Sequence, residues 1–163
     1  MGNIKTKFVQ NSYIFLDIDG VLNCSTTRTN DRETHMPQHD LLNNLKKISD
    51  IIPNTVIILS STWRLTVEER RLVDIYLDKI DLKISGYTSD KSVDASGDRP
   101  AEILEYININ KINQPWIAID DMDMLRMSDQ LNDINFCRTD DRYGLTSEKA
   151  DEVITKLLNQ TNK

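Results

Sequence analysis

YIFLDIDGVLN, residues 13–23, joins an apolar run to two aspartates, Asp17 and Asp19. Four consecutive apolar or aromatic residues indicate a strand buried on both faces, with Asp17 at its carboxyl end. In an open α/β sheet, ligands bind at that end of the strands. Residues i and i+2 of an extended chain point to the same side, so the two carboxylates repel unless a cation lies nearby or one of them is protonated. Because only oxygen ligands are offered, the pattern favours Mg²⁺ over zinc.

The Asp-x-Asp-Gly pattern also occurs in calcium loops and in ordinary Asx turns. A calcium loop of the EF-hand kind follows a helix and carries an acid at its fifth position. Here a strand is predicted before the pattern, and the fifth position is Val21. The EF-hand interpretation is therefore disfavoured, while an Asx turn stays an alternative to a catalytic site.

The totals predict one domain spanning residues 1–163. The hydrophobic content of 39% and the charged content of 28% are typical of soluble globular proteins. No apolar run reaches the roughly 18 residues that span a bilayer, and the first residues lack the apolar core of a signal peptide, so we expect a cytoplasmic protein. A net charge of −6 creates no long-range attraction for nucleic acid, although a local basic groove is compatible with it. Cys24 and Cys137 are expected to be reduced, buried thiols.

The rest of the chain alternates predicted strands with predicted helices. Further strands are expected at residues 55–59, 82–86, 116–119 and 134–137. Helices are expected at residues 40–52 and after Thr66, Arg99 and Thr146. Residues 24–38 and 87–98 are predicted to be polar loops, and loops of this length are often functional. This alternation predicts an α/β fold with a parallel sheet and helices on both of its faces.

Polar side chains follow two of the other predicted strands. Ser60 and Ser61 end the second strand, and Asp120 and Asp121 end the fourth. Arg99 adds a cation at the start of a helix. Since parallel strands place their carboxyl ends on one edge of the sheet, we expect these groups to converge with Asp17 and Asp19.

In their order and placement, these clusters resemble the four motifs of the haloacid dehalogenase (HAD) superfamily of phosphohydrolases. The first motif matches residues 17–21, the second matches residues 56–60, and the fourth matches Asp120 and Asp121. The cation of the third motif is best met by Arg99, with Lys91 as the weaker candidate. The sequence SSTWR at residues 60–64 and the segment around Gly144 look like a small capless branch that includes the HAD domains of RNA repair proteins. The resemblance implies a three-layer Rossmann-like (HAD-like) fold with a mostly parallel five-stranded sheet and no cap domain.

The resemblance also implies a Mg²⁺-dependent phosphomonoester hydrolase. Asp17 would attack phosphorus and form an aspartyl-phosphate, and Asp19 would give and take the proton. Mg²⁺ would be held by Asp17, by the backbone carbonyl of Asp19, and by Asp121.

The resemblance also implies which residues would bind the phosphoryl group or support its binding. Ser60, Ser61 and Arg99 would hold the phosphoryl oxygens, and Asp120 would orient Arg99 or a water on the metal. Because only short loops lie between the motifs, the site should stay open and admit phosphate on a large or extended molecule.

Two other functions remain open. A polynucleotide end phosphatase in nucleic-acid repair predicts a basic track around Arg28, Arg32, Arg64 and Arg99. A non-catalytic phosphoryl-binding module of the receiver kind has no use for an acid at Asp19, so the spacing disfavours it. Trp63 is expected to pack in the core or to bind substrate. For Arg28 and Arg64, substrate contact and a solvated surface position are equally compatible with the sequence.

Overall fold

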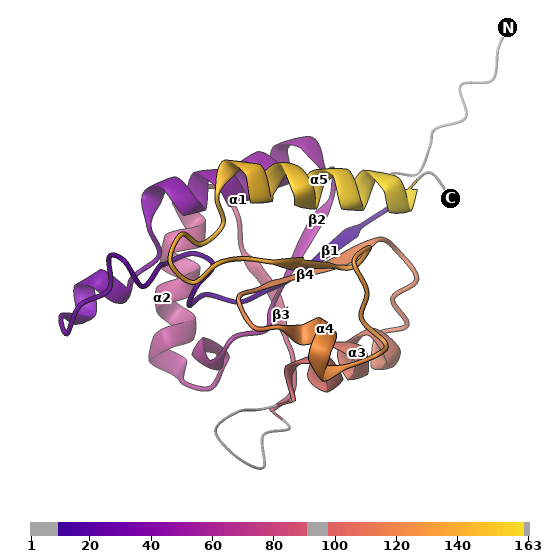
Figure 1. Ribbon diagram of the computed structural model, residues 1–163, viewed down its shortest axis with the longest axis horizontal. Coiled ribbons are helices and arrows are strands. Elements are labelled where there is room, and N and C mark those ends of the chain that lie inside the picture. The colour runs from indigo at the N-terminus through magenta and orange to yellow at the C-terminus, as the bar shows by residue number, and fades with distance from the viewer. Residues whose placement is uncertain (1–9, 91–97, 162–163) are drawn as a thin grey trace, which may run out of the picture.

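A computed structural model describes residues 10–90 and 98–161 (Figure 1). Its five strands form one sheet in the order β3-β2-β1-β4-β5, and every neighbouring pair is parallel. The strands are β1 (Ser12–Leu16), β2 (Thr55–Leu59), β3 (Ile84–Tyr87), β4 (Trp116–Asp120) and β5 (Phe136–Arg138). The predicted α/β fold with a five-stranded parallel sheet is confirmed.

Helices cover both faces of this sheet and make three layers (Figure 1). The α-helices are α1 (His39–Ile51), α2 (Val67–Asp78), α3 (Arg99–Ile109), α4 (Met124–Met127) and α5 (Ser147–Thr161). Two single 3-10 turns, η1 (Arg32–His35) and η2 (Thr62–Arg64), lie in the connections after β1 and β2. No cap domain interrupts the described ranges, and no helix within them is long and apolar enough to cross a membrane.

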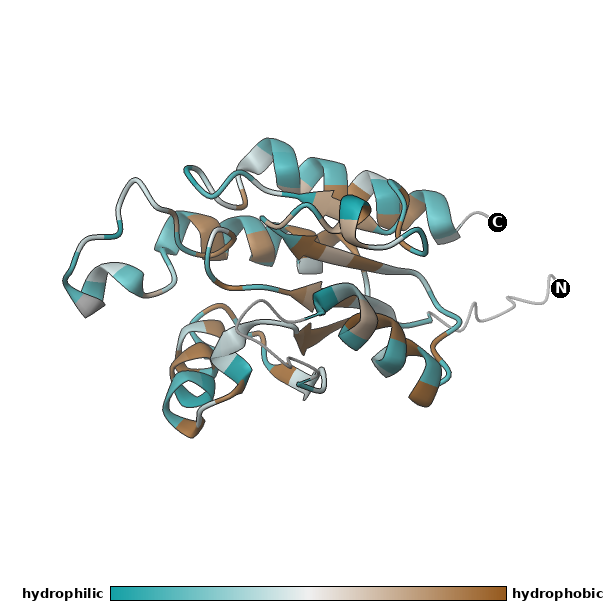
Figure 2. Ribbon diagram, turned by 60° about the horizontal axis from the view of Figure 1, so that its bottom comes forward, coloured by the Kyte–Doolittle hydropathy of each residue, from teal (hydrophilic) through white to brown (hydrophobic). Residues whose placement is uncertain are grey.

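Alternate residues of the strands enter two separate hydrophobic cores. Ile14 and Leu16 of β1 pack in the core beneath α1, α2 and α5. Phe15 of the same strand faces the second core, together with Ile103 of α3 and Met124 of α4. The apolar residues accordingly lie on the strands and on the inner faces of the helices (Figure 2). Burial on both faces explains why β1, β2 and β4 are almost uniformly apolar in sequence.

The strand register decides which residues meet at the carboxyl edge. Leu16 pairs with Leu59 of β2 and with Ile119 of β4, so the residue after each of these three lies at the same level. The chain builds the sheet outward from β1 in one direction through β2 and β3, then returns to the other side with β4. The edge beside β1 and β4 is therefore the point where the strand order reverses, and ligands bind at such a point in open α/β sheets.

Two predicted strands have different boundaries. The third strand was expected from residue 82, but the backbone N–H of Leu82 donates to Leu77 and closes the end of α2. The fifth was expected from residue 134, but Asn132 and Asn135 form a side-chain-bonded turn that leaves Ile134 exposed, so β5 starts at Phe136. In both cases local hydrogen bonds outweigh the β propensity of an apolar residue.

Helix starts follow the predicted caps more closely. The Thr66 hydroxyl accepts the N–H of Glu69 at 3.2 Å, and the Thr146 hydroxyl accepts that of Lys149 at 3.3 Å. The short helix α4 is a single turn that begins directly after its N-cap residue, Asp123. Cys24 and Cys137 are buried free thiols, as expected.

Candidate functional site

Three carboxylates from two neighbouring strand ends meet at the carboxyl edge of the sheet. Asp17 follows β1, whereas Asp120 ends β4 and Asp121 follows it. One oxygen from each of the three lies within 4.8 Å of the others, and Asp17 and Asp120 are buried. Oxygen ligands at this spacing can hold a divalent hard cation. The predicted convergence of these acids is thus present in the structure.

Arg99 is the cation that faces this acidic cluster. Asp98 caps α3 by accepting the N–H of Ala101 at 3.1 Å, which places Arg99 in the first turn of the helix. One guanidinium nitrogen of Arg99 lies 2.6 Å from Asp120 Oδ2 and 3.2 Å from Asp17 Oδ1. The contact with Asp120 is the one that the resemblance implied. Lys91, the weaker candidate for this position, lies outside the described residues.

The pKa values of all three acids in the cluster are raised, chiefly by burial. Burial raises the pKa of Asp17, and Arg99 and a hydrogen bond from Ser61 offset this only in part. Burial, followed by the Asp17 carboxylate, raises the pKa of Asp120 to about 8. Burial and then Asp141 raise the pKa of Asp121. Three acids with raised pKa values beside one guanidinium form a site that gains by binding positive charge.

Arg99 stays charged in this setting. Burial by itself lowers the pKa of its guanidinium, but Asp17 and Asp120 outweigh the burial and raise that pKa. A charged guanidinium with several donors is suited to hold anionic oxygens.

Ser60 and Ser61 lie where the register predicts, directly beside Asp17. The backbone N–H of Ser60 donates to Leu16 at 2.8 Å, and both serines are buried. The Ser60 hydroxyl has no hydrogen-bond partner among the described residues, whereas the Ser61 side chain bonds Asp17. A buried hydroxyl without a partner is costly, so the Ser60 hydroxyl has bonding capacity to offer an oxygen ligand.

Asp19 lies apart from the acidic cluster and is held by its own set of donors. Its side chain accepts hydrogen bonds from Asn23 Nδ2 at 2.8 Å and from Trp63 Nε1 at 3.0 Å. A guanidinium nitrogen of Arg28 lies 3.5 Å from Asp19 Oδ1. The Asp19 side chain is 42% exposed, against 7% for that of Asp17. Asp17 and Asp19 are therefore different in kind: one carboxylate is buried among acids, and the other is accessible and fixed by hydrogen bonds.

Gly20 forms a tight turn directly after Asp19 and lies against Asp121 of the acidic cluster. Its φ of +74° is one that side-chain-bearing residues rarely adopt. A Cβ at this position would lie 2.7 Å from Cγ of Asp121. Glycine is thus required both by the backbone conformation and by the close approach of Asp121.

Trp63 and Arg64 have structural contacts that the sequence did not specify. The Trp63 ring is buried and also donates to Asp19. Arg64 is buried too, where it pairs with Glu102 at 2.8 Å and donates to the carbonyls of Ser61 and Thr88. A solvated position for Arg64 is therefore wrong, because its guanidinium ties the end of β2 to β3 and α3.

Asn23 and Asp141 are site residues that sequence reasoning missed. Asn23 is fully buried and bonds Asp19, Arg28 and the carbonyl of His35. Asp141 pairs with Arg28 from the other end of the chain. The spacing of Asn23 four residues after Asp19 gave a local signal, but the Arg28 to Asp141 pair depends on tertiary packing alone.

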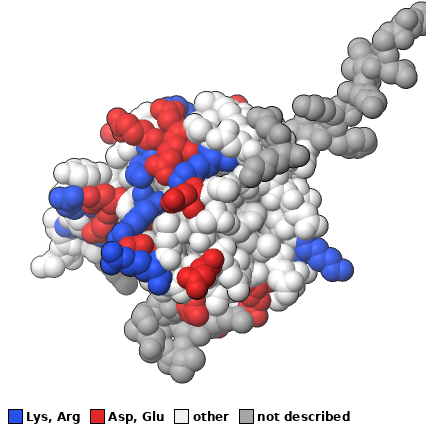
Figure 3. Space-filling model, turned by 45° about the vertical axis from the view of Figure 1, so that its right-hand side comes forward, with Lys and Arg blue, Asp and Glu red and all other residues white. Residues whose placement is uncertain are grey.

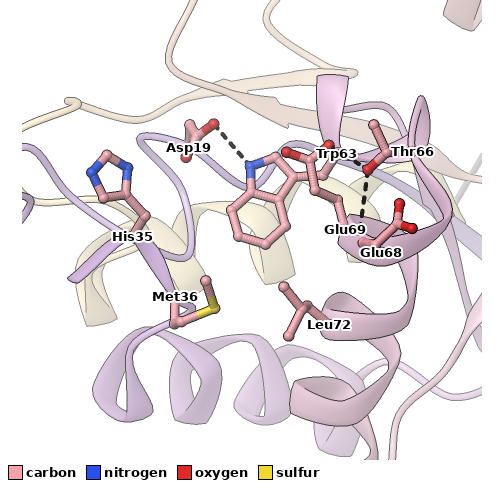
Figure 4. Close-up of a pocket in the computed structure, with 8 residues that line it drawn as sticks. All are labelled: Asp19, His35, Met36, Trp63, Thr66, Glu68, Glu69 and Leu72. Carbon is pink, nitrogen blue, oxygen red and sulfur yellow. Dashed lines mark hydrogen bonds between the residues drawn. The ribbon is translucent and has the colours of Figure 1, made fainter. Parts of the chain in front are cut away.

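A cleft of about 500 Å³ opens beside Asp19. It lies between the end of η1, η2 and the start of α2 (Figure 4). Its lining residues are Asp19, His35, Met36, Trp63, Thr66, Glu68, Glu69 and Leu72. We call it the Trp63 cleft. It gives Asp19 an open approach from one side.

Comparison with known proteins identifies the family but no individual relative. Searches of curated proteins and of solved structures returned no match. Residues 13–150 match the family described as the HAD domain in Swiss Army Knife RNA repair proteins. The match covers every predicted motif and confirms the resemblance drawn from them. The chain therefore belongs to the family of HAD domains found in Swiss Army Knife RNA repair proteins.

Proposed function

We propose that this protein is a Mg²⁺-dependent phosphomonoester hydrolase that acts through an aspartyl-phosphate on Asp17. Membership of a HAD family supports a phosphohydrolase-type role. The observation that carries the finer proposal is the cluster of Asp17, Asp120 and Asp121 around Arg99 at the point where the strand order reverses.

The residues of the cluster fit a magnesium ion. Among the described residues, Arg99 pairs with Asp17 and Asp120 but not with Asp121, and all three acids have raised pKa values. A divalent cation would balance this charge, and oxygen donors favour Mg²⁺. Asp17 and Asp121 would hold the ion together with the backbone carbonyl of Asp19. When bound, the ion supplies positive charge that stabilises the phosphoryl oxygens during transfer.

The chain's own residues divide the chemistry between them. An oxygen of Asp17 attacks phosphorus, and its P–O bond forms as the bond to the leaving oxygen breaks. Asp19 gives its proton to that leaving oxygen and later takes one from the hydrolytic water. Asn23 and Trp63 fix the Asp19 carboxyl, which keeps the proton in reach of the leaving group.

The oxygens of the transferred phosphoryl group need hydrogen-bond donors, because negative charge shifts during the transfer. Arg99 supplies a charged fork beside Asp17, and the Ser60 hydroxyl supplies a bond that no described residue uses. Ser61 already bonds Asp17, so it would orient the nucleophile as much as bind phosphate. Asp120 holds Arg99 in place at 2.6 Å.

Hydrolysis of phenyl phosphate with Mg²⁺ tests this proposal. We expect turnover that chelation with EDTA removes and that Asp17→Asn abolishes. Asp129→Asn is a matched control, because it makes the same chemical change at an exposed position on the same protein. An absence of turnover with Mg²⁺ across phosphorylated metabolites and end-phosphorylated oligonucleotides would refute it and favour a phosphoryl-binding module.

An RNA end phosphatase is the second candidate, and the family match favours it. The absence of a cap in the described chain leaves the site open to a large substrate. Three of the four arginines expected to form the basic track are already paired with acids, however. Arg64 and Arg99 are buried in ion pairs, and Arg28 pairs with Asp141. The side chain of Arg32 is not among those that the structure describes.

The face drawn in Figure 3 shows no continuous basic track. On the face drawn in Figure 3, basic and acidic side chains lie next to one another beside a broad uncharged area. Hydrolysis of a 3′- or 5′-phosphorylated oligonucleotide should be compared with that of the matching mononucleotide at several salt concentrations. A preference for the oligonucleotide that weakens as the salt concentration rises would support the RNA end phosphatase. Equal rates for both substrates would contradict it.

A further inference from the structure

The two sides of the candidate site differ in charge. On the Asp121 side, a second cleft of about 610 Å³ is lined by Asp121, Arg138, Thr139, Asp140, Asp141, Arg142 and Lys149. On the Asp19 side, no Lys or Arg is among the lining residues of the Trp63 cleft. The cleft on the Asp121 side therefore offers both cations and carboxylates, whereas the Trp63 cleft offers carboxylates and no Lys or Arg in its lining. Arg28, 3.5 Å from Asp19, is paired with Asp141 and lies outside that lining.

The walls of the Trp63 cleft combine an apolar surface with an acidic rim. Trp63, Met36 and Leu72 give the apolar part, and Figure 4 shows the Met36 and Leu72 side chains below the indole ring. Glu68 and Glu69 come from the first turn of α2. Neither glutamate forms an ion pair with the residues that the structure describes, and Glu69 is oriented by the Thr66 hydroxyl at 3.0 Å. Such walls favour apolar groups and repel anions.

The position of Asp19 links this cleft to the reaction. Asp19 lines the cleft, and its Oδ2 accepts the indole N–H of Trp63 at 3.0 Å. A general acid must lie within hydrogen-bond reach of the oxygen that it protonates. The leaving oxygen, and the group attached to it, therefore lie on the Asp19 side, where the Trp63 cleft is the space next to them.

We propose that the Trp63 cleft holds the leaving group and selects leaving groups that have an apolar face and are neutral or cationic. A leaving group with a second anionic substituent is disfavoured by Glu68 and Glu69. This inference rests on the proposed function, since it takes Asp19 as the acid. It places any further anionic part of a substrate outside this cleft.

Three aryl phosphates with leaving phenols of similar acidity test the selectivity: phenyl phosphate, 4-(aminomethyl)phenyl phosphate and 4-carboxyphenyl phosphate. We expect kcat/KM to fall in the order ammonium, neutral, carboxylate, by about two- to fivefold per step, the range that one exposed charge pair supports. Glu68→Lys should remove most of this order, because the new lysine offsets the charge of Glu69, which stays in place. Glu148→Lys is the matched control, because Glu148 is likewise the second residue of its helix and is exposed, and it lies outside the cleft. It should keep the wild-type order.

Binding of the three product phenols gives a readout that does not depend on turnover. The indole N–H signals of Trp63 and Trp116 can be followed by NMR and assigned with Trp116→Phe, because the chain has two tryptophans. Trp116 is the first residue of β4 and lies at the amino-terminal ends of the strands, away from the candidate site, so it serves as an internal control. We expect 4-(aminomethyl)phenol to shift the Trp63 signal alone, and at lower concentration than 4-hydroxybenzoate.

The outcomes separate the two proposals. Turnover of all three phosphates without a charge order, or with an order that Glu68→Lys leaves unchanged, would overturn the cleft assignment and leave the phosphatase intact. Selective binding of the cationic phenol at Trp63, without turnover of the aryl phosphates, phosphorylated metabolites or end-phosphorylated oligonucleotides, would refute the phosphatase and keep the cleft as a binding site. A Trp63 signal that no phenol shifts would overturn the cleft assignment.

Discussion

Replacing Asp120 by asparagine should remove a pH dependence from the folding stability of the metal-free protein. Burial and the Asp17 carboxylate raise the pKa of Asp120 from its ordinary 3.8 to about 8. Between these two pH values the folded protein keeps a proton that the unfolded chain releases. The contribution of Asp120 to stability is therefore greatest at low pH and falls as the pH rises toward the folded pKa.

The size of the effect follows from the linkage. One proton corresponds to about 1.4 kcal/mol per pH unit, so roughly 3 kcal/mol is lost between pH 5 and pH 7. For a chain of this length, that corresponds to a fall in Tm of roughly 6–12 °C. The asparagine side chain cannot ionise, so Asp120→Asn should lack this part of the fall.

Thermal unfolding in EDTA at pH 5, 6 and 7 measures the difference between wild type and Asp120→Asn. Asp129→Asn is the control for the chemical change, and it should follow the wild type. Saturating Mg²⁺ should stabilise the wild type more at pH 7 than at pH 5, because the ion takes the place of the proton. A difference between wild type and Asp120→Asn that does not change with pH would refute the argument that this cluster is short of positive charge.

Three other substitutions and conditions test separate parts of the site. Asp19→Asn should lower kcat by about 10²–10⁴-fold for alkyl phosphates and by less for aryl phosphates, whose leaving groups need no proton; equal losses would remove the general-acid role. Gly20→Ala should cost about 1–2 kcal/mol of stability by denaturant unfolding and weaken Mg²⁺ binding, since φ is +74° and the new Cβ meets Asp121; wild-type values of both would contradict the turn argument. Small generic phosphates should show a high KM because an uncapped site offers little remote binding energy, and one small metabolite preferred by orders of magnitude over every polymer would contradict the open site.

Much of the fold was predictable because its strands are buried on both faces. The apolar runs of β1, β2 and β4 have no helical periodicity, and a polar residue directly follows each run. Where a strand is short and lies at the edge of the sheet, the signal is weaker. Side chains of Asn132 and Asn135 decide where β5 begins, and such local bonds are not visible in the hydrophobic pattern.

The candidate site was predictable where it depends on strand ends. Asp17, Ser60 and Asp120 each come directly after a residue that is paired with its neighbours in the adjacent strands. Their convergence therefore needs only a parallel sheet. The fixation of Asp19 by Trp63 was not predictable, because it joins residues 44 positions apart through the packing of η2. The burial of Arg64 was missed for the same reason, since its partner Glu102 comes from α3.

Trapping of the covalent intermediate tests the central claim most directly. Excess protein is mixed with ³²P-labelled phenyl phosphate and Mg²⁺ and quenched in acid within one turnover, and the labelled peptide is mapped by mass spectrometry. One phosphoryl group should be found on Asp17, and none on the Asp17→Asn variant. Hydrolysis of the substrate with no label on the protein, or with the label on another residue, would contradict the assignment of Asp17 as the nucleophile.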